Sequence, residues 1–346
     1  MPLRDSRFRR GSWYYAYGGC VMRIHGLAAL LAAAVLTLAA CSVVSAGLLP
    51  TPVLRGSINL RPHGCIAPHN LAYWKGRVYV SGAADSGEGP TIWDVDVNNP
   101  ASPTYVQGVG VGYKAYGTKI VEDKLYVANW YTLLRINDIY NGALTQLGEY
   151  FMPGRYGWAV DVAHGRAYVA QGVETYSSIE SFDITNPSSP RYITSQPAVL
   201  SAIGSGEVRG SYLYHGDNHF SQAIPLYLFV IRNISDEANP YVLTQIERPY
   251  PVSEVHLRGN YAYLMMSVWG GGGLEIWDIS DPVSPTMVGH YYSDVGGSSG
   301  CLYGDYAFYA TSGNGVIGVD ISNPVNPHIV AQPDLTGLEL CVKAAG

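Results

Sequence analysis

The sequence predicts an all-β fold, a β-propeller of four-stranded blades, from a repeated phrase and from the composition. The phrase occurs six times, at WDVDVNNPASP (93–103), INDIYNGALT (136–145), FDITNPSSP (182–190), RNISDEANP (232–240), EIWDISDPVSP (275–285) and IGVDISNPVNP (317–327). Its anchor residues are spaced by 42, 45, 50, 45 and 42 positions: Asp96, Asp138, Asp183, Asn233, Asp278 and Asp320. A period of this size marks a solenoid, a propeller or another array. The 40 Gly, 21 Pro and 28 Tyr, with only 14% charged residues, suit many short strands and tight turns.

Each repeat is expected to contribute four strands in the same order. A moderately apolar first strand and a turn with Gly and a charge come first. A Tyr-Val type strand follows, at GRVYVSG (76–82), DKLYVAN (123–129), GRAYVAQ (165–171), GSYLYHG (210–216), GNYAYLM (259–265) and GDYAFYA (304–310). The third strand ends in the repeated phrase, and a fourth strand follows it. Four short β-rich runs bounded by Gly, Pro and Asn are the pattern of one propeller blade.

The repeated acidic residue has a mechanical explanation. An Asp side chain accepts hydrogen bonds from nearby backbone amides in turns. The residue before a Pro is pushed to extended geometry, and the Pro itself has no N–H for a strand ladder, so the strand stops. We therefore interpret Asp96, Asp138, Asp183, Asp278 and Asp320 as turn formers and not as ligands of a cation.

The phrase VIGVDISNPVNP (316–327) resembles the LVIVD repeat, a family of extracytoplasmic bacterial and archaeal β-propellers. The likeness covers about residues 51–346, nearly all of the chain that follows residue 40. Two units depart from the pattern, with Asn141-Gly142 and Asp236-Glu237 in place of Asn-Pro, but both keep residues that favour turns. Trp-Asp pairs at 93–94 and 277–278 do not indicate a WD40 protein, because only two units carry the pair and no Gly-His partner recurs.

The six complete units leave one strand at each end of the propeller segment. Residues 51–60 align with the outer strand at 284–293, and residues 337–346 resemble an inner strand. We therefore expect six complete blades plus a partial seventh in a truncated chain, with a six-bladed ring carrying spare terminal strands as the alternative. A disulfide between Cys65 and Cys341 would link the two ends; the alternative is that these two and Cys301 are buried thiols.

The N-terminus precedes the repeats and predicts export. From Met22 a basic start, an apolar run and small residues ending at Cys41 form a secretory signal. Leu38-Ala39-Ala40-Cys41 resembles a bacterial lipobox, which implies lipid attachment at Cys41; an ordinary signal peptide cleaved near Ala46 is the alternative. We divide the chain into an upstream extension (1–21), a signal peptide (22–40), a short tether (41–50) and the propeller (51–346). The expected location is extracytoplasmic, as a membrane-anchored lipoprotein or, alternatively, a secreted protein.

The formal net charge of −6 argues against a nucleic-acid partner, whose binding needs clustered Lys and Arg. No basic run follows Cys41, so membrane attachment is expected through the lipid alone. We expect a monomer.

Binding residues are expected on one rim of the propeller. The loops between second and third strands vary most from unit to unit, and they share a face with the blade-to-blade connections. Variable loops on a rigid scaffold are typical of a binding surface. Trp130, Tyr131, Tyr176 and Trp269 are the candidates on this rim, as aromatic side chains that stack on sugars or peptides. His63 and His69, which flank Cys65, are expected at the entrance of the axial channel.

The segment His215-Gly216-Asp217-Asn218-His219 is the candidate metal site. In extended backbone His215, Asp217 and His219 point the same way, and two imidazoles with one carboxylate suit a divalent cation. The alternative is a solvated polar hairpin tip.

No nucleophile elbow, phosphate-binding glycine loop, zincin helix or Cys-x-x-Cys occurs in the sequence, so no catalytic residue is predicted. We therefore expect a surface binding or interaction scaffold whose partner is a surface protein, a peptide or a glycan. Two alternatives stay open, because propellers host many functions. One is an extracytoplasmic hydrolase or lyase that uses a metal near His215 and His219. The other is a structural envelope protein.

Overall fold

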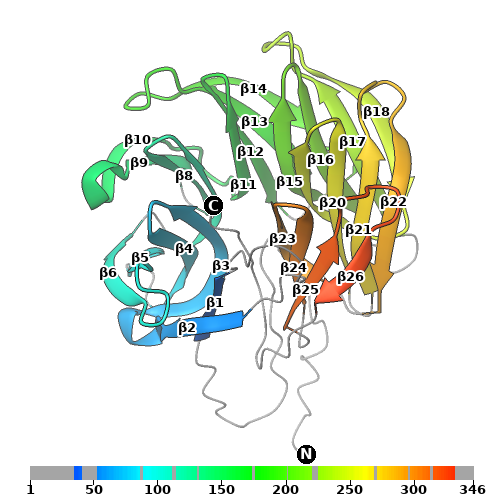
Figure 1. The fold of residues 1–346 in the computed structure, drawn as a ribbon. Coiled ribbons are helices and arrows are strands. Elements are labelled where there is room, and N and C mark those ends of the chain that lie inside the picture. The colour runs from blue at the N-terminus through cyan, green and yellow to red at the C-terminus, as the bar shows by residue number, and fades with distance from the viewer. Residues whose placement is uncertain are drawn as a thin grey trace, which may run out of the picture.

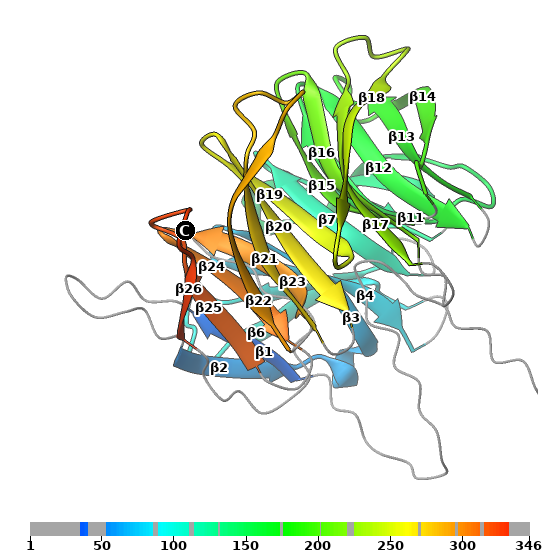
Figure 2. The same ribbon diagram turned by 90° about the vertical axis from the view of Figure 1, so that its right-hand side faces the viewer.

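Six antiparallel four-stranded sheets, arranged as the blades of a propeller, make up the fold (Figures 1 and 2). This computed structural model describes residues 35–40, 53–85, 89–110, 114–130, 132–173, 176–200, 202–219, 225–268, 271–294, 297–311 and 315–331. In each sheet the strands are hydrogen-bonded in chain order, from first to fourth. The first strands of successive blades contact one another, which places them innermost and the fourth strands at the periphery. The predicted all-β propeller is confirmed.

The first three blades run through residue 197. Blade 1 contains β3 (Cys65–Trp74), β4 (Arg77–Ala84), β5 (Ile92–Asp96) and β6 (Thr104–Val109). Blade 2 contains β7 (Ala115–Val121), β8 (Lys124–Asn129), β9 (Leu133–Asp138) and β10 (Thr145–Tyr150). Blade 3 contains β11 (Gly157–Ala163), β12 (Arg166–Val173), β13 (Tyr176–Asp183) and β14 (Arg191–Pro197).

The last three blades have the same order. Blade 4 contains β15 (Ala202–Arg209), β16 (Tyr212–His219), β17 (Leu226–Asn233) and β18 (Tyr241–Arg248). Blade 5 contains β19 (Val252–Arg258), β20 (Tyr261–Val268), β21 (Gly271–Asp278) and β22 (Thr286–Ser293). Blade 6 contains β23 (Gly297–Tyr303), β24 (Tyr306–Thr311), β25 (Gly315–Asp320) and β26 (His328–Ala331).

The repeated phrase forms the turn between the third and fourth strands. Every third strand ends on an anchor residue, whose side-chain oxygen accepts a hydrogen bond from the backbone N–H two residues later. In blade 5, for example, Asp278 Oδ1 lies 2.9 Å from the nitrogen of Ser280. A second such bond joins Asp281 Oδ1 to the Val283 nitrogen at 3.0 Å. The interpretation of the anchors as turn formers is therefore confirmed.

The apolar core lies between the blades. Five clusters join adjacent sheets, and two lie within blades 1 and 6. One of the five, for example, packs Leu134 and Ile136 of blade 2 against Val169 and Phe182 of blade 3. At the periphery the outer strand of one blade touches the turn of the next. A Cβ at Gly289 would collide with the carbonyl oxygen of Pro324, so this position needs Gly. The turn phrase thus ends a strand within its own blade and packs against the preceding blade.

The chain before the first blade forms a separate two-stranded sheet of β1 (Val35–Ala40) and β2 (Val53–Asn59). The outer strand predicted at 51–60 is present as β2, which pairs with β1. Residues 337–346, expected to complete a partial seventh blade, lie outside the described residues, which contain six complete blades. β1 falls within the predicted signal peptide, whose removal stays a prediction.

Two short 3₁₀ helices complete the described structure, η1 (Arg61–His63) and η2 (Tyr140–Gly142). No helix in the described ranges has the length and apolar character needed to cross a membrane. Cys65 is a buried free thiol and Cys301 is also buried, and Cys341, the predicted partner of Cys65, lies outside the described residues. Burial raises the pKa of the Cys65 thiol to about 12, which keeps it protonated at neutral pH.

Candidate functional site

Five aromatic side chains gather where the inner strands of blades 1, 2 and 3 begin. They are His69 of β3, Tyr116 of β7, Trp130 in the turn between β8 and β9, and Tyr156 and Trp158 at the start of β11; we call them the rim cluster. The turn is held in place because the Trp130 N–H donates to the carbonyl oxygen of Lys114 at 2.9 Å. The cluster therefore combines a second-to-third strand turn with blade-to-blade connections, as expected for the variable rim.

The rings contact one another in a continuous chain. His69 stacks on Tyr116, with ring centroids 4.4 Å apart. Tyr116 lies 4.4 Å from Trp158, and Trp130 lies 4.3 Å from Tyr156. Tilted and offset arrangements at these distances are the favourable geometries for aromatic pairs. Mutual packing therefore holds the rings in fixed orientations.

The rim cluster is only partly covered by protein. Tyr116 is buried, whereas His69, Trp130, Tyr156 and Trp158 are half-buried. Gly172 makes room for the indole of Trp158, because a Cβ there would lie 3.1 Å from Trp158 Nε1. The partly exposed rings therefore form an apolar surface where the inner strands of blades 1, 2 and 3 begin.

The charge of the rim cluster comes from Lys114, whose Nζ lies 4.9 Å from the ring centroid of Trp130. Burial, together with the charge of Lys114, lowers the pKa of His69 to about 4, although a hydrogen bond between His69 Nδ1 and the carbonyl oxygen of Ala115 opposes this shift. His69 is therefore neutral at pH 7. The surface is suited to a ligand with a flat apolar face.

Of the four predicted rim residues, only Trp130 has its side chain among the described parts of the structure. Trp130 lies at the centre of the cluster. Tyr131 and Trp269 lie outside the described residues, and Tyr176 is the first residue of β13, with its side chain outside the described part. Sequence reasoning missed Tyr116, Tyr156 and Trp158, which directly follow the blade-to-blade connections. The expectation that these connections share the face of the variable loops would have located them.

The two histidines that were expected at the channel entrance lie in different parts of the fold. His69 joins the rim cluster, whereas His63 lies in η1 and stacks on Tyr105 of the outer strand β6, with centroids 3.8 Å apart. His63 is therefore at the periphery and not at the channel.

The candidate metal segment is strand and not a solvated tip. β16 continues to His219, so that His215 and Asp217 are buried while His219 is exposed. His215 Nδ1 contacts the carbonyl oxygen of Gly216 at 2.9 Å, and its Nε2 accepts a hydrogen bond from Arg232 Nε at 3.0 Å. Asp217 accepts from the backbone nitrogen of Val199 at 2.6 Å. Within the described ranges, no three His, Cys, Asp or Glu side chains lie close enough to hold a metal.

One position of the inner strand carries chemically distinct residues around the propeller. In each blade the residue at this position pairs with an aromatic residue of the second strand that lies seven positions later in the chain. From blade 1 to blade 6 the residues are Ala72, Lys119, Asp161, Glu207, His256 and Cys301. Lys119 Nζ lies 2.7 Å from Asp161 and 3.6 Å from Glu207. The constant spacing would have revealed this set in the sequence.

These axial carboxylates have a structural role. Asp161 Oδ2 accepts a hydrogen bond from the Val208 nitrogen at 2.7 Å, and Glu207 Oε2 accepts one from the Leu257 nitrogen. Both N–H groups belong to the inner strand of the next blade, whose inner edge has no strand partner. Burial raises the pKa of Asp161, against the attraction of Lys119. These two carboxylates thus supply hydrogen-bond partners to backbone N–H groups at the inner strand edges, which would otherwise be unpaired near the propeller axis.

Solved structures similar to this chain share low sequence identity with it. The computationally designed Ika8 protein matches with a TM-score of 0.52 and 11% identity, over 82% of this chain and 92% of that one. The WD40 repeats of RRP9 match with a TM-score of 0.59 and 10% identity, over 79% of this chain and 82% of that one. A protein from Lactobacillus plantarum matches with a TM-score of 0.55 and 13% identity, over 75% of this chain and 82% of that one. At these identities the likeness supports the fold alone.

Sequence comparison is more specific. No curated protein matches the chain. The family model of the LVIVD repeat matches residues 251–293 and 299–333, which cover blades 5 and 6. The chain is therefore a β-propeller whose blades 5 and 6 match the LVIVD repeat.

Proposed function

We propose that this protein is an extracytoplasmic interaction scaffold that binds a sugar ring or a peptide side chain on its rim cluster. The observation that carries the proposal is the set of half-buried rings, Trp130, Tyr156, Trp158 and His69, fixed against one another at one mouth of the propeller. A ligand that stacks on pre-ordered rings loses little free energy to ordering them. Lipid attachment at Cys41 would hold the scaffold at a membrane surface; the Leu38-Ala39-Ala40-Cys41 sequence supports this part.

The ligand class follows from the surface chemistry. Partly exposed aromatic faces beside the cation of Lys114 favour a ligand with an apolar face and a polar edge. Sugars and peptides with proline or aromatic side chains have this character. The negative net charge supports neither nucleic acid nor an anionic membrane surface as the partner.

Arrays of immobilised glycans and peptides, probed with the purified protein, test the proposal. Trp130→Ala should reduce binding about tenfold, because an aromatic contact contributes roughly 0.5–1.5 kcal/mol beyond its buried area. Tyr140→Ala is the matched control: this residue is 55% exposed and lies in the turn at the other end of β9. Equal binding by wild type and Trp130→Ala, or no ligand on either array, would contradict the proposal. The array that responds identifies the partner class.

A further inference from the structure

A second recessed surface, separate from the rim cluster, lies between blades 3 and 4. It is a groove of about 490 Å³, lined by the end of β14, the connection that follows it, and the turn and first residues of β18. Its polar lining includes Gln196 and Arg232, and its outer lining includes Asn239 and Tyr241. This volume is within the range of small-molecule sites.

Arg232 is a buried cation in a position that four of the other five blades fill with apolar side chains. It directly precedes the turn anchor, where Val95, Phe182, Trp277 and Val319 stand in blades 1, 3, 5 and 6. Arg232 is only 3% exposed. An Arg at a core position is unfavourable unless its charge has a partner, so its presence in blade 4 calls for an explanation.

The direct hydrogen-bond partners of Arg232 are neutral. Its Nε donates to His215 Nε2 at 3.0 Å, and its Nη2 donates to the carbonyl oxygen of Pro197 at 2.8 Å. His215 is uncharged, because burial and the nearby guanidinium lower its pKa to about 3. Asp217 attracts Arg232 only over a longer distance, since its carboxylate accepts from the nitrogens of Val199 and Leu200. Among the described residues no carboxylate forms an ion pair with Arg232.

Gln196 adds an amide without hydrogen-bond partners. It is 3% exposed, and within the described structure neither its Nε2 nor its Oε1 has a partner. It pairs in register with Ile179, whose side chain packs against Ile203 and Leu213 of blade 4, so Gln196 lies on the face toward the groove. A buried amide with no partner is destabilising, and native structures contain few of them.

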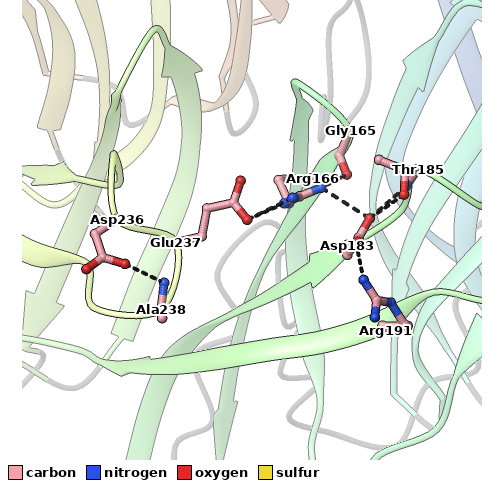
Figure 3. Close-up of polar contacts among 8 residues, drawn as sticks. All are labelled: Gly165, Arg166, Asp183, Thr185, Arg191, Asp236, Glu237 and Ala238. Carbon is pink, nitrogen blue, oxygen red and sulfur yellow. Dashed lines mark hydrogen bonds and ion pairs between the residues drawn. The ribbon is translucent and has the colours of Figure 1, made fainter.

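An ion-pair bridge holds the wall of the groove. Arg166 of blade 3 donates to Glu237 in the blade 4 turn at 2.8 Å and to Asp183 at 3.1 Å (Figure 3). Arg191 donates to the other oxygen of Asp183 at 2.6 Å. Hydrogen bonds from Thr185, then Arg191, hold the pKa of Asp183 well below its usual range. The bridge fixes the turn that contains Ala238 against blade 3, so the groove is formed before a ligand arrives.

We propose that this groove binds a carboxylate-bearing ligand, with the carboxylate accepting hydrogen bonds from Arg232 and Gln196. Arg232 uses one N–H of Nε and one of Nη2 for His215 and Pro197, so Nη1 and the second N–H of Nη2 are left to donate to a carboxylate. The Gln196 amide supplies a further donor in the same groove. A singly charged group suits the groove better than a phosphate dianion, because Asp217 already offsets part of the Arg232 charge and Glu237 lies on the adjacent turn. Free acids, acidic peptides and acidic sugars share this chemistry.

Calorimetric titration with succinate, the dipeptide Glu-Glu and galacturonate, at constant ionic strength and pH 7, tests the proposal and separates these sources. At least one probe should bind and raise the melting temperature of the wild type. Gln196→Leu should weaken that binding at least tenfold, while its melting temperature without ligand stays unchanged or rises, since an unpartnered amide is removed. Gln245→Leu, an exposed outer-strand residue of blade 4, is the matched control and should bind as the wild type does.

Arg232→Met provides the second variant. It should fold, because apolar residues occupy this position in four other blades, and it should bind none of the three probes. Failure of all three probes to bind the wild type would overturn the proposal. Equal binding by wild type and Gln196→Leu, or inorganic phosphate binding as tightly as the carboxylates, would also overturn it. Loss of rim binding in Trp130→Ala should leave carboxylate binding unchanged, so the two sites are tested independently.

Discussion

Removing the guanidinium of Arg248 should destabilise the protein more than the loss of an exposed ion pair would. Arg248 ends the outer strand of blade 4 and donates to Glu275 of blade 5 through Nε at 2.8 Å and Nη2 at 2.6 Å. The Glu275 side chain is 0% exposed and the Arg248 side chain 12%. Trp277 Nε1 also donates to Glu275 at 2.9 Å, and the guanidinium lies 4.7 Å from the ring centroid of Trp277. This ion pair therefore joins two blades within the protein interior.

The expected cost of Arg248→Met is about 3 kcal/mol in the free energy of unfolding. Breaking a buried pair by removing one partner costs about 3–5 kcal/mol, because a charge is left buried without its counterion. The lower end applies, since Trp277 and Tyr292 still donate to the Glu275 carboxylate. Arg248→Met combined with Glu275→Met should cost less than Arg248→Met alone, because no charge then remains buried.

Urea denaturation followed by tryptophan fluorescence measures these differences, and urea adds no ionic strength. Arg191→Met is the control: its side chain is 76% exposed and contacts Asp183 at 2.6 Å, so its loss should cost about 0–1 kcal/mol. A cost for Arg248→Met no larger than that of Arg191→Met would refute the reasoning. A double variant less stable than Arg248→Met would refute it as well.

Three further predictions concern the turn, the anchor and pH. Asp278→Ala should lower the midpoint of thermal or urea unfolding, whereas Asp278→Asn, which keeps the oxygen that accepts from Ser280, should lower it less. Unchanged melting with lost ligand binding would instead make Asp278 a ligand. Cys41→Ser should yield soluble protein or uncleaved precursor in cell fractionation, and normal cleavage with retention in the membrane would exclude lipid attachment there. The pKa of His69 is about 4 in the folded protein against an ordinary value of 6.5, so the unfolded chain binds more protons between these values and stability should fall as pH drops through that window. His69→Gln should show a shallower fall in urea unfolding across the same pH range, and an unchanged slope would mean that His69 does not titrate as described.

The fold could be predicted because its determinants are local. Asp278 bonds to an amide two residues away, and the following Pro cannot continue a ladder, so each turn is encoded within a few residues. The third strands accordingly end on the anchors that the repeat identifies. Pairing of β2 with β1 was not predicted, because the residues 51–60 resemble an outer strand whichever strand lies beside them.

The site could be predicted only in part because its contacts are made between blades. Trp130 was recognisable as a loop aromatic, but its packing with Tyr156 depends on how blade 3 follows blade 2. The polar sequence around His215 suggested a solvated tip, yet this strand is buried because Arg232 and the connection at Val199 satisfy its polar groups. Arg232 itself was visible in the sequence, as a charge in a position that is apolar in four other repeats.

Hydrogen–deuterium exchange with and without a ligand selected on the arrays tests most directly whether the rim cluster is the binding surface. Slower exchange should appear in residues 114–116, 130–132 and 156–158, where ligand contact would add to bonds such as that from the Trp130 N–H to Lys114. The outer strands β6 and β22 should exchange as before. Slower exchange confined to those outer strands, with the three rim segments unchanged, would contradict the proposed function.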